Sequence, residues 1–433
     1  MSSLVDFQKH GAIGVLTVNN PPVNALSQGV RQGLADGVAK GLDDAGVAAL
    51  IIIGGGRTFI AGADIREFGK PMLPPNLLDV LDAIEGSGKP VIAAIHGTAL
   101  GGGLEVALAC HWRVAVESGQ VGLPEVKLGL LPGAGGTQRL PRLVGAAAAL
   151  DMIVSGNPIG ARKALAMGVV DEVVGGDLLA GAIAFAEKVV REKRPLKVVS
   201  RSDDKVKGTD PKLFADFRKA NERKLRGFFA PWRCIETIEA ACTLPFAEGM
   251  KKERELFMQC MASPERAAQI HVFFAEREAA KIPDVPADTA PKKIAKAAVI
   301  GAGTMGGGIA MNFANAGVPV KLLEVSQEAL AKGLGVIEKN YATSVGRGSM
   351  PQAAMDKAMS LISGTQRYED IGDADIVVEA VFEEMDIKKK VFATLDKVMK
   401  PGAIPHCGMK AVEASAASSR TIRLEATSSV RSR

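Results

Sequence analysis

Residues 97–138 read GTALGGGLEVALACHWRVAVESGQVGLPEVKLGLLPGAGGTQ. The three glycines at 101–103 stand between an apolar, strand-like run at 91–95 and an apolar, helix-like run that contains Glu105. Glycine lets a backbone approach a ligand closely, and the first N–H groups of a helix have no partner inside it, so such a turn can hold an anionic oxygen. A second carboxylate, Glu125, follows in a Leu-Pro-Glu-Val context. Because a buried, unpaired carboxylate is costly, two of them in apolar settings indicate a functional site.

Simpler explanations exist for each feature taken singly. Either glutamate alone is explained as a paired structural residue or as part of a solvated face. A glycine cluster alone is explained as a tight strand-to-helix turn without a ligand. A second glycine-rich loop, GGGRTFIAGAD, lies upstream at residues 54–64. The carboxylate pair beside two glycine loops therefore favours a site over these explanations.

Residues 1–190 resemble the crotonase (enoyl-CoA hydratase/isomerase) family, through four motifs in the family's order. The matching stretches are NAL at 24–26, FIAGAD at 59–64, ALGGGLE at 99–105, and LPE at 123–125 followed by LGLLPG at 128–133 and GGTQ at 135–138. The resemblance implies an α/β fold, built as a spiral of ββα units. Two strand-like runs within residues 4–19 and a helical pattern at 26–42 fit the first such unit.

The resemblance also implies site residues. Two backbone N–H groups, which match to Ala63 and Gly102, would form an oxyanion hole for the thioester oxygen of an acyl-CoA. The two catalytic hydratase carboxylates match to Glu105 and Glu125. Both are present in this sequence, which favours hydration over the chemistry of family members that keep one carboxylate.

Residues 191–292 change in character. Charged residues become more frequent, and helical periodicity dominates. This segment resembles the helical linker of multifunctional fatty-acid oxidation enzymes, which joins a hydratase to a dehydrogenase. It ends in IPDVPADTAP at 282–291, where three prolines predict an extended, stiff connection and a domain boundary.

A dinucleotide-binding pattern follows. A short apolar strand is predicted at 297–300, then a GxGxxG loop at 301–306, a helix, a second strand, and an acid at Glu324. This order and spacing are typical of a Rossmann unit that binds NAD. Glu324 would accept hydrogen bonds from ribose hydroxyls and repel the 2′-phosphate of NADP. The candidate cofactor-binding residues of the loop are Gly301, Gly303, Thr304, Met305 and Gly306.

Residues 293–404 resemble the NAD-binding domain of 3-hydroxyacyl-CoA dehydrogenase. The resemblance places Glu383 and Lys388 near the nicotinamide half of the cofactor. It ends at about residue 404, before the family's catalytic histidine and helical C-terminal domain. We therefore expect a partial NAD-binding domain without dehydrogenase activity, and an irregular tail at 405–433.

Composition narrows the class of protein. The 433 residues carry a net charge of +5 with no dense basic run, which argues against nucleic acid as a partner. Five scattered cysteines fit a reducing compartment and no metal site. No signal peptide, membrane-spanning run or peroxisomal C-terminal signal is evident, so the expected location is a cytoplasm of bacterial type.

The sequence thus predicts hydration of trans-2-enoyl-CoA to 3-hydroxyacyl-CoA in fatty-acid β-oxidation, with an NAD-binding part attached. The alternatives are a Δ3,Δ2-enoyl-CoA isomerase on the same site and a catalytically weak fragment that binds nucleotides. Acyl-CoA is the expected small-molecule substrate. Self-association and a complex with a thiolase stay open as further partner interactions.

Overall fold

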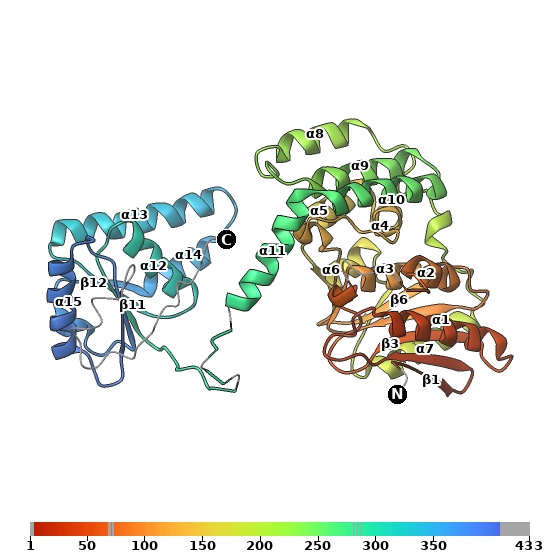
Figure 1. Cartoon of the computed structure of the whole chain (residues 1–433), viewed down its shortest axis with the longest axis horizontal. Coiled ribbons are helices and arrows are strands. Elements are labelled where there is room, and N and C mark those ends of the chain that lie inside the picture. Colours follow the sequence, from red (N-terminus) through yellow and green to blue (C-terminus); the bar gives the residue numbers. More distant parts are fainter. Residues whose placement is uncertain are drawn as a thin grey trace. The chain divides into compact units, whose positions relative to one another are not determined.

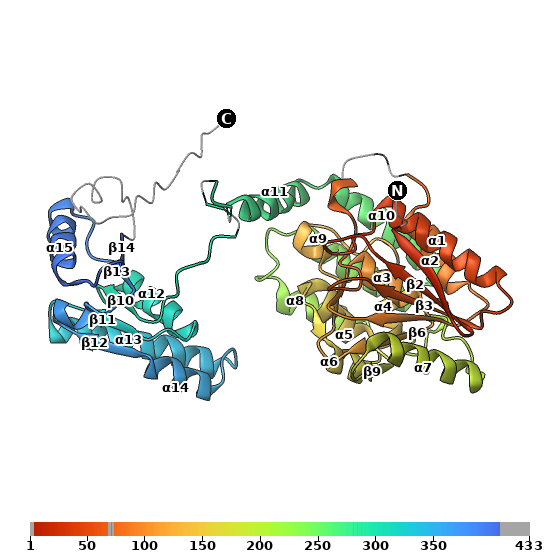
Figure 2. The same ribbon diagram turned by 90° about the horizontal axis from the view of Figure 1, so that it is seen from below.

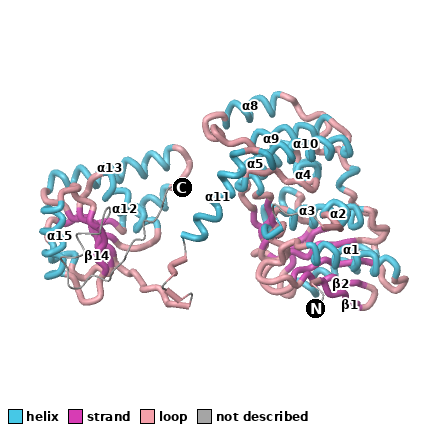
Figure 3. Tube along the Cα trace, viewed as in Figure 1, coloured by secondary structure: helices cyan, strands magenta, loops and turns pink. Residues whose placement is uncertain are grey.

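The computed structural model describes residues 4–67, 71, 73–279, 281–283, 285–286 and 288–407. The chain forms two compact units, unit 1 (residues 1–283) and unit 2 (residues 284–433). In each unit the strands gather into sheets that carry helices around them, as the colours in Figure 3 show. This arrangement confirms the expected α/β class.

Unit 1 is organised around a six-stranded sheet with the order β1-β2-β3-β4-β6-β9. The first pair is an antiparallel hairpin, and every later pair is parallel. Its strands are β1 (Val5–His10), β2 (Ile13–Val18), β3 (Ala49–Gly54), β4 (Val91–Ile95), β6 (Trp112–Val116) and β9 (Glu172–Val174). A smaller sheet contains β5 (Thr98–Leu100), β7 (Gln120–Gly122) and β8 (Ile159–Gly160).

Successive residues of a strand point to opposite faces of the sheet. Both faces of the large sheet carry apolar side chains, and helices cover both of them. Ile52 of β3 packs in one hydrophobic cluster with α1 (Gln28–Asp43) and α2 (Leu77–Glu85). Its neighbour Ile51 packs in a second cluster with α7 (Leu178–Arg191), on the other face. Figure 2 shows α1 and α7 with the strands between them.

One short helix, α3 (Gly102–Ala109), lies entirely inside this unit, since all eight of its residues are buried. It follows β5 directly and therefore begins at the glycine run of the sequence. The other short elements of the region are η1 (Ile65–Glu67), η2 (Glu125–Leu128), α4 (Gly136–Val144), α5 (Ala146–Ser155), α6 (Ala161–Met167) and η3 (Val199–Arg201).

The segment expected to be a linker is largely part of unit 1. It forms α8 (Lys212–Asn221), α9 (Ala230–Thr243), α10 (Phe246–Ala262) and α11 (Pro264–Ala279). α9 packs against α4, α5 and α10, and α8 packs against α9, in the group of helices that Figure 1 shows together. The same hydrophobic cluster as the sheet core contains residues from three of these helices, namely Phe214, Cys234, Ile235, Ile238, Leu256 and Cys260. Their burial explains why the compact unit extends to residue 283 rather than 190.

Unit 2 contains a five-stranded parallel sheet with the order β12-β11-β10-β13-β14. The strands are β10 (Ala297–Ile300), β11 (Val320–Leu323), β12 (Ile362–Thr365), β13 (Ile376–Glu379) and β14 (Ile404–Cys407). The helices are α12 (Thr304–Asn315), α13 (Gln327–Gly346), α14 (Gln352–Ser360) and α15 (Met385–Val398), with a short η4 (Tyr368–Ile371). The strand order reverses at β10, and ligands of open α/β sheets bind where the order reverses.

The last strand of unit 2 runs past the position where we expected the family pattern to end. β14 continues from Ile404 to Cys407 and pairs in parallel with β13. It supplies the fifth strand of the sheet, so Pro405, His406 and Cys407 belong to the fold rather than to a tail. The remainder of the expected tail, residues 408–433, lies outside the described residues.

Candidate active site

The first feature of the site is the turn that begins α3. Gly101 has a φ of +53°, a left-handed value that favours glycine. A Cβ on Gly103 would collide with the carbonyl oxygen of Ile60, so this position also requires glycine. The loop at 59–64 is held beside the turn by β-bridges from Leu26 to Ala63 and from Ile60 to Ala99. The two glycine loops of the sequence are therefore neighbours in space.

The two predicted oxyanion donors lie at this junction. The Ala63 nitrogen is 3.8 Å from the position that a Cβ on Gly102 would occupy. Gly102 is the first residue of α3, so its N–H has no partner within the helix. Among the described residues, neither the Ala63 N–H nor the Gly102 N–H donates a hydrogen bond. Two adjacent N–H groups are thus left available to one acceptor.

Glu105 lies one helical turn after Gly101 and is buried. Its Oε1 accepts hydrogen bonds from the Ala134 N–H at 2.8 Å and from the Gly136 N–H at 2.9 Å. No group in the described part of the chain donates to its Oε2. The carboxylate is therefore anchored through one oxygen and leaves the other for a ligand.

Glu125 approaches the same turn from η2. Its Oε1 is 3.1 Å from the position of a Cβ on Gly101, so the carboxyl lies against the backbone at the start of α3. Its Oε2 is buried, and none of the described residues donates a hydrogen bond to it. The structure thus brings Glu105 and Glu125, which are 20 residues apart in sequence, to the first turn of one helix.

Burial raises the pKa of both carboxyls, and a neighbouring charge adds to the rise at Glu125. Burial raises the pKa of Glu105, and the hydrogen bonds from Ala134 and Gly136 oppose that rise. Burial raises the pKa of Glu125 well above its ordinary value, and the negative charge of Glu105 raises it further. Such raised values are typical of carboxyls that transfer protons near neutral pH.

A third carboxyl, Glu253 of α10, was missed by the sequence analysis. It is 1% exposed and accepts hydrogen bonds from the Gly135 N–H at 2.7 Å and from the Thr137 N–H at 3.2 Å. Burial, and next the charge of Glu105, raise the pKa of Glu253 to about 8. In the sequence it lies inside the charged run 251–255, which is typical of a solvated helix face. The available signal was its place in a helical stripe of buried positions, which are Gly249, Glu253, Leu256 and Cys260.

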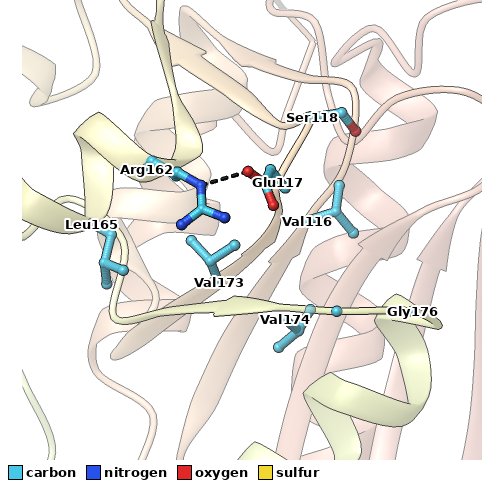
Figure 4. Close-up of a pocket in the computed structure, with 9 residues that line it drawn as sticks. Val116, Glu117, Ser118, Arg162, Leu165, Val173, Val174 and Gly176 are labelled. Atoms are coloured by element: carbon cyan, nitrogen blue, oxygen red, sulfur yellow. Dashed lines mark hydrogen bonds and ion pairs between the residues drawn. The ribbon is translucent and has the colours of Figure 1, made fainter.

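An open surface pocket of about 760 Å³ lies elsewhere on unit 1, between the end of β6, α6 and β9. Figure 4 shows the ion pair of Arg162 with Glu117 across it, at 2.5 Å. None of the predicted site residues lines this pocket. We therefore place the candidate site at α3, where the free N–H groups and the carboxyls meet.

In unit 2 the glycine loop follows β10, at the point where the strand order reverses. A Cβ on Gly306 would collide with the carbonyl oxygen of Gly301, so the loop closes tightly onto α12. A Cβ on Gly303, in contrast, would meet no atom within 4 Å. Thr304 and Met305, the first two residues of α12, are exposed. The loop therefore offers an open helix N-terminus of the kind that binds a pyrophosphate.

The other predicted cofactor residues fall into two groups. Glu324 lies just beyond β11 and reaches back to the glycine loop, where its Oε1 accepts from the Ala302 N–H at 2.8 Å. Lys388 is buried, and its Nζ contacts carboxylate oxygens of Glu383 at 3.2 Å and Glu379 at 3.1 Å. Glu379, the last residue of β13, was not predicted. It pairs in register with Ile300 and so joins the Lys388 cluster to the strand that carries the glycine loop.

Comparison with known proteins identifies both units. The enoyl-CoA hydratase/isomerase family matches residues 8–228, more than half of the chain. The chain belongs to this family. The NAD-binding domain of 3-hydroxyacyl-CoA dehydrogenase matches residues 296–422, a range that includes β14 and continues past the expected end at 404. Both resemblances expected from the sequence are confirmed.

Similar proteins are named as bifunctional or multifunctional enzymes. A peroxisomal bifunctional enzyme of Danio rerio is 39% identical, over 91% of this chain and 54% of its own length. That of Homo sapiens is 38% identical, over 96% and 58%. The peroxisomal fatty acid β-oxidation multifunctional protein MFP2 of Arabidopsis thaliana is 38% identical, over 89% and 55%. The chain thus spans about half the length of these relatives.

These names correct one expectation. A cytoplasmic location of bacterial type was expected, and it is wrong, because the relatives are named peroxisomal or glyoxysomal enzymes. The sequence argument failed because it relied on the absence of a terminal signal. None of the described helices is both long enough and apolar enough to cross a bilayer.

Proposed function

We propose that unit 1 hydrates the 2,3 double bond of a trans-2-enoyl-CoA. The observation that carries this proposal is the pair Glu105 and Glu125 at the first turn of α3, each with an Oε2 that lacks a donor among the described residues. Two carboxylate oxygens are the acceptors that a single water molecule requires. The N–H groups of Ala63 and Gly102 at the same turn supply the donors that a thioester oxygen requires.

The reaction follows from these groups. The carboxylate pair removes a proton from the water, whose oxygen bonds to C3 of the substrate. Electrons of the double bond move towards the thioester, and the enolate oxygen accepts hydrogen bonds from Ala63 and Gly102. A proton delivered to C2 by the pair completes the addition. A preorganised donor of this kind contributes roughly 3 kcal/mol to the stability of the transition state.

Acid and base roles belong to the pair rather than to single residues. The charge of Glu105 raises the pKa of Glu125, so the two groups titrate together. One proton shared between them gives the site both a base for the water and an acid for C2. This need explains why both carboxyls are held in a buried position at the cost of desolvation.

An isomerase activity on the same site is the second candidate. A glutamic acid beside an oxyanion hole can move a proton from C2 to C4 of a 3-enoyl-CoA, and the raised pKa of Glu125 favours proton shuttling. Supply of 3-enoyl-CoA, with detection of the conjugated 2-enoyl thioester by its ultraviolet absorbance, separates this activity from hydration. A chain that is stabilised by acyl-CoA and NAD but shows neither turnover would be the weak nucleotide-binding fragment instead.

For unit 2 we propose NAD binding at the loop of Gly301, Gly303 and Gly306. The open helix N-terminus at Thr304 and Met305 would receive the pyrophosphate, and Glu324 the adenosine ribose. Glu383 and Lys388 would lie towards the nicotinamide. Exposed apolar side chains border this region, since Met305 is 58% and Val325 90% exposed, and a bound nucleotide would cover them.

Two further expectations stay predictions. Absence of 3-hydroxyacyl-CoA oxidation by this 433-residue chain is tested by NADH formation from 3-hydroxybutyryl-CoA. Self-association and a complex with a thiolase are tested by the mass of the purified protein alone and with a thiolase. From the names of its relatives we also propose a peroxisomal location, which imaging of the tagged protein beside a peroxisomal marker tests.

The hydration proposal is tested by mixing purified chain with crotonyl-CoA. Loss of the ultraviolet absorbance of the conjugated thioester, with formation of 3-hydroxybutyryl-CoA, is the expected result. Stable absorbance in the presence of folded protein would contradict the proposal.

A further inference from the structure

The turn at residues 134–137 anchors the Glu105 carboxyl, and it also forms hydrogen bonds to a second carboxyl. The N–H groups of Ala134 and Gly136 donate to Oε1 of Glu105, at 2.8 and 2.9 Å. The N–H groups of Gly135 and Thr137, which alternate with them, donate to the two oxygens of Glu253, at 2.7 and 3.2 Å. Four consecutive N–H groups are thus shared between two carboxyl groups. The turn cannot change its peptide orientations without losing hydrogen bonds to both.

Helix α10 packs closely against residues beside this turn, both before and after Glu253. A Cβ on Gly249 would collide with the side chain of Gln138, and a Cβ on Gly133 would lie 2.6 Å from the Phe257 ring. Gly249, Glu253 and Phe257 are each four residues apart, so they lie on one face of the helix. The position of the Glu253 carboxyl relative to the turn is therefore fixed by close packing of a side chain against a glycine backbone, one helical turn before it and one after it.

A hydrogen-bond chain fixes the orientation of the same carboxyl. Nε2 of Gln138 donates to Oγ1 of Thr137 and to the carbonyl oxygen of Thr237 in α9. Because Oγ1 already accepts this hydrogen bond, its own hydroxyl hydrogen is directed to Oε2 of Glu253. Glu253 is thus held by three donors. A glutamate that only filled space in the core would need none of them, and its burial would be costly.

We propose that Glu253 is a positioning residue for the hydratase reaction, which holds the turn 134–137 in the conformation that anchors Oε1 of Glu105 and leaves its Oε2 for the water. This inference rests on the function proposed for Glu105 and Glu125. It assigns a role in the site to α10, a helix that the sequence indicates to be part of a linker. Glu253 does not contact the substrate in this account, since its oxygens face the turn.

The test compares Glu253→Ala and Glu253→Gln with a matched control, Glu255→Gln. Glu255 lies two residues further along the same helix, is exposed, and pairs with Lys252 at the surface. Both Glu253 variants are expected to lower kcat for crotonyl-CoA by about 10- to 100-fold, because a misplaced reacting group costs that much. KM should change less than about twofold, since the oxyanion donors and the acyl-CoA contacts are untouched. The control should keep wild-type kcat and KM.

Two results distinguish positioning from support of the fold. Gln at position 253 keeps the volume and one acceptor oxygen, so it preserves the fold if the alanine variant unfolds. In a cycle with Glu105→Gln, the double variant Glu105→Gln/Glu253→Gln should be no slower than Glu105→Gln alone, because Glu253 acts through Glu105. Losses that multiply in the double variant, or a folded Glu253→Gln with wild-type kcat, would overturn this inference and leave the proposed function standing. If the wild-type protein itself does not hydrate crotonyl-CoA, both this inference and the proposed function are wrong.

Discussion

Glu105 and Glu253 accept hydrogen bonds from alternate N–H groups of the same four-residue turn, although 148 positions separate them in the sequence. The relationship joins α3, which is the centre of the candidate site, to α10. It also places the two carboxyls close enough that the charge of Glu105, after burial, raises the pKa of Glu253. Several properties of the protein should therefore depend on residues beyond 228, where the family match ends.

The stability of unit 1 should decrease as the pH rises, because Glu253 loses its proton. Its pKa is raised from an ordinary 4.5 to about 8 in the folded protein, so the fold binds a proton that the unfolded chain releases. The resulting stabilisation is fully present below pH 4.5 and is lost as the pH rises through about 8, with a slope of up to about 1.4 kcal/mol per pH unit. Melting temperatures of wild type and Glu253→Gln between pH 5 and pH 8 measure this slope.

In that comparison the advantage of wild type over Glu253→Gln should shrink as the pH rises. Glu255→Gln, which alters an exposed pair, should follow the wild-type curve. A difference between wild type and Glu253→Gln that is constant or grows with pH would show that Glu253 is ionised throughout, against this account.

A chain ending at residue 228 should fail to fold, whereas one ending at residue 283 should fold. The shorter chain lacks α9 and α10, whose side chains Ile235, Ile238 and Leu256 are at most 1% exposed in the core. Each such side chain contributes about 1.5–3 kcal/mol through its burial, and total stabilities are about 5–15 kcal/mol. Solubility and circular dichroism of the two purified chains check this. A soluble, cooperatively melting 1–228 chain would show that α9 and α10 are dispensable.

The sequence predicted most of the fold but not the role of these helices. Strands such as β3 and β10 are short apolar runs that end at a glycine, so the sequence identifies them directly. The stripe of α10 is weaker, because a glycine and a glutamate occupy two of its four buried positions. A buried carboxylate in a charged run has the same local pattern as a solvated one. Its partners at 135 and 137 belong to a distant segment, so local reasoning could not identify it.

Sequence motifs also indicated which candidate site residues would lie together, although not all of their neighbours. Motif matching selected Glu105, Glu125, Ala63 and Gly102, and the structure brings all four to one turn. Glu379 was missed because it ends a buried strand, where a single acid has no periodic signature. Its pairing with Lys388 depends on α15 returning to β13, which is a property of the tertiary structure.

Gly303→Ala should weaken NAD binding without loss of stability. The added methyl meets no protein atom within 4 Å, and the φ of −69° suits alanine. It would instead occupy the space in front of the α12 N-terminus, where the pyrophosphate should lie. Titration calorimetry should give an affinity at least about tenfold lower, a change of about 1.4 kcal/mol. Gly308→Ala, also without a neighbour within 4 Å, is the matched control and should bind NAD normally. Equal affinities for the two variants would place the nucleotide elsewhere.

Glu324→Ala should reduce the preference for NAD over NADP. The carboxylate lies at the end of β11, beside the glycine loop, where a 2′-phosphate would meet its negative charge. Its removal costs NAD the hydrogen bonds to the ribose and relieves NADP of this repulsion. The ratio of the two dissociation constants, measured for wild type and variant, should move towards one. An unchanged ratio would exclude Glu324 from the ribose site.

The central claim is that Glu105 and Glu125 together bind the water and remove its proton. Hydration of crotonyl-CoA by wild type, Glu105→Gln and Glu125→Gln, with crotonyl-CoA binding measured in parallel, tests it most directly. We predict that each substitution lowers kcat by about 10²- to 10⁴-fold, the usual contribution of an acid or base, while the dissociation constant of the thioester stays within about threefold. Wild-type turnover in either variant would contradict the account.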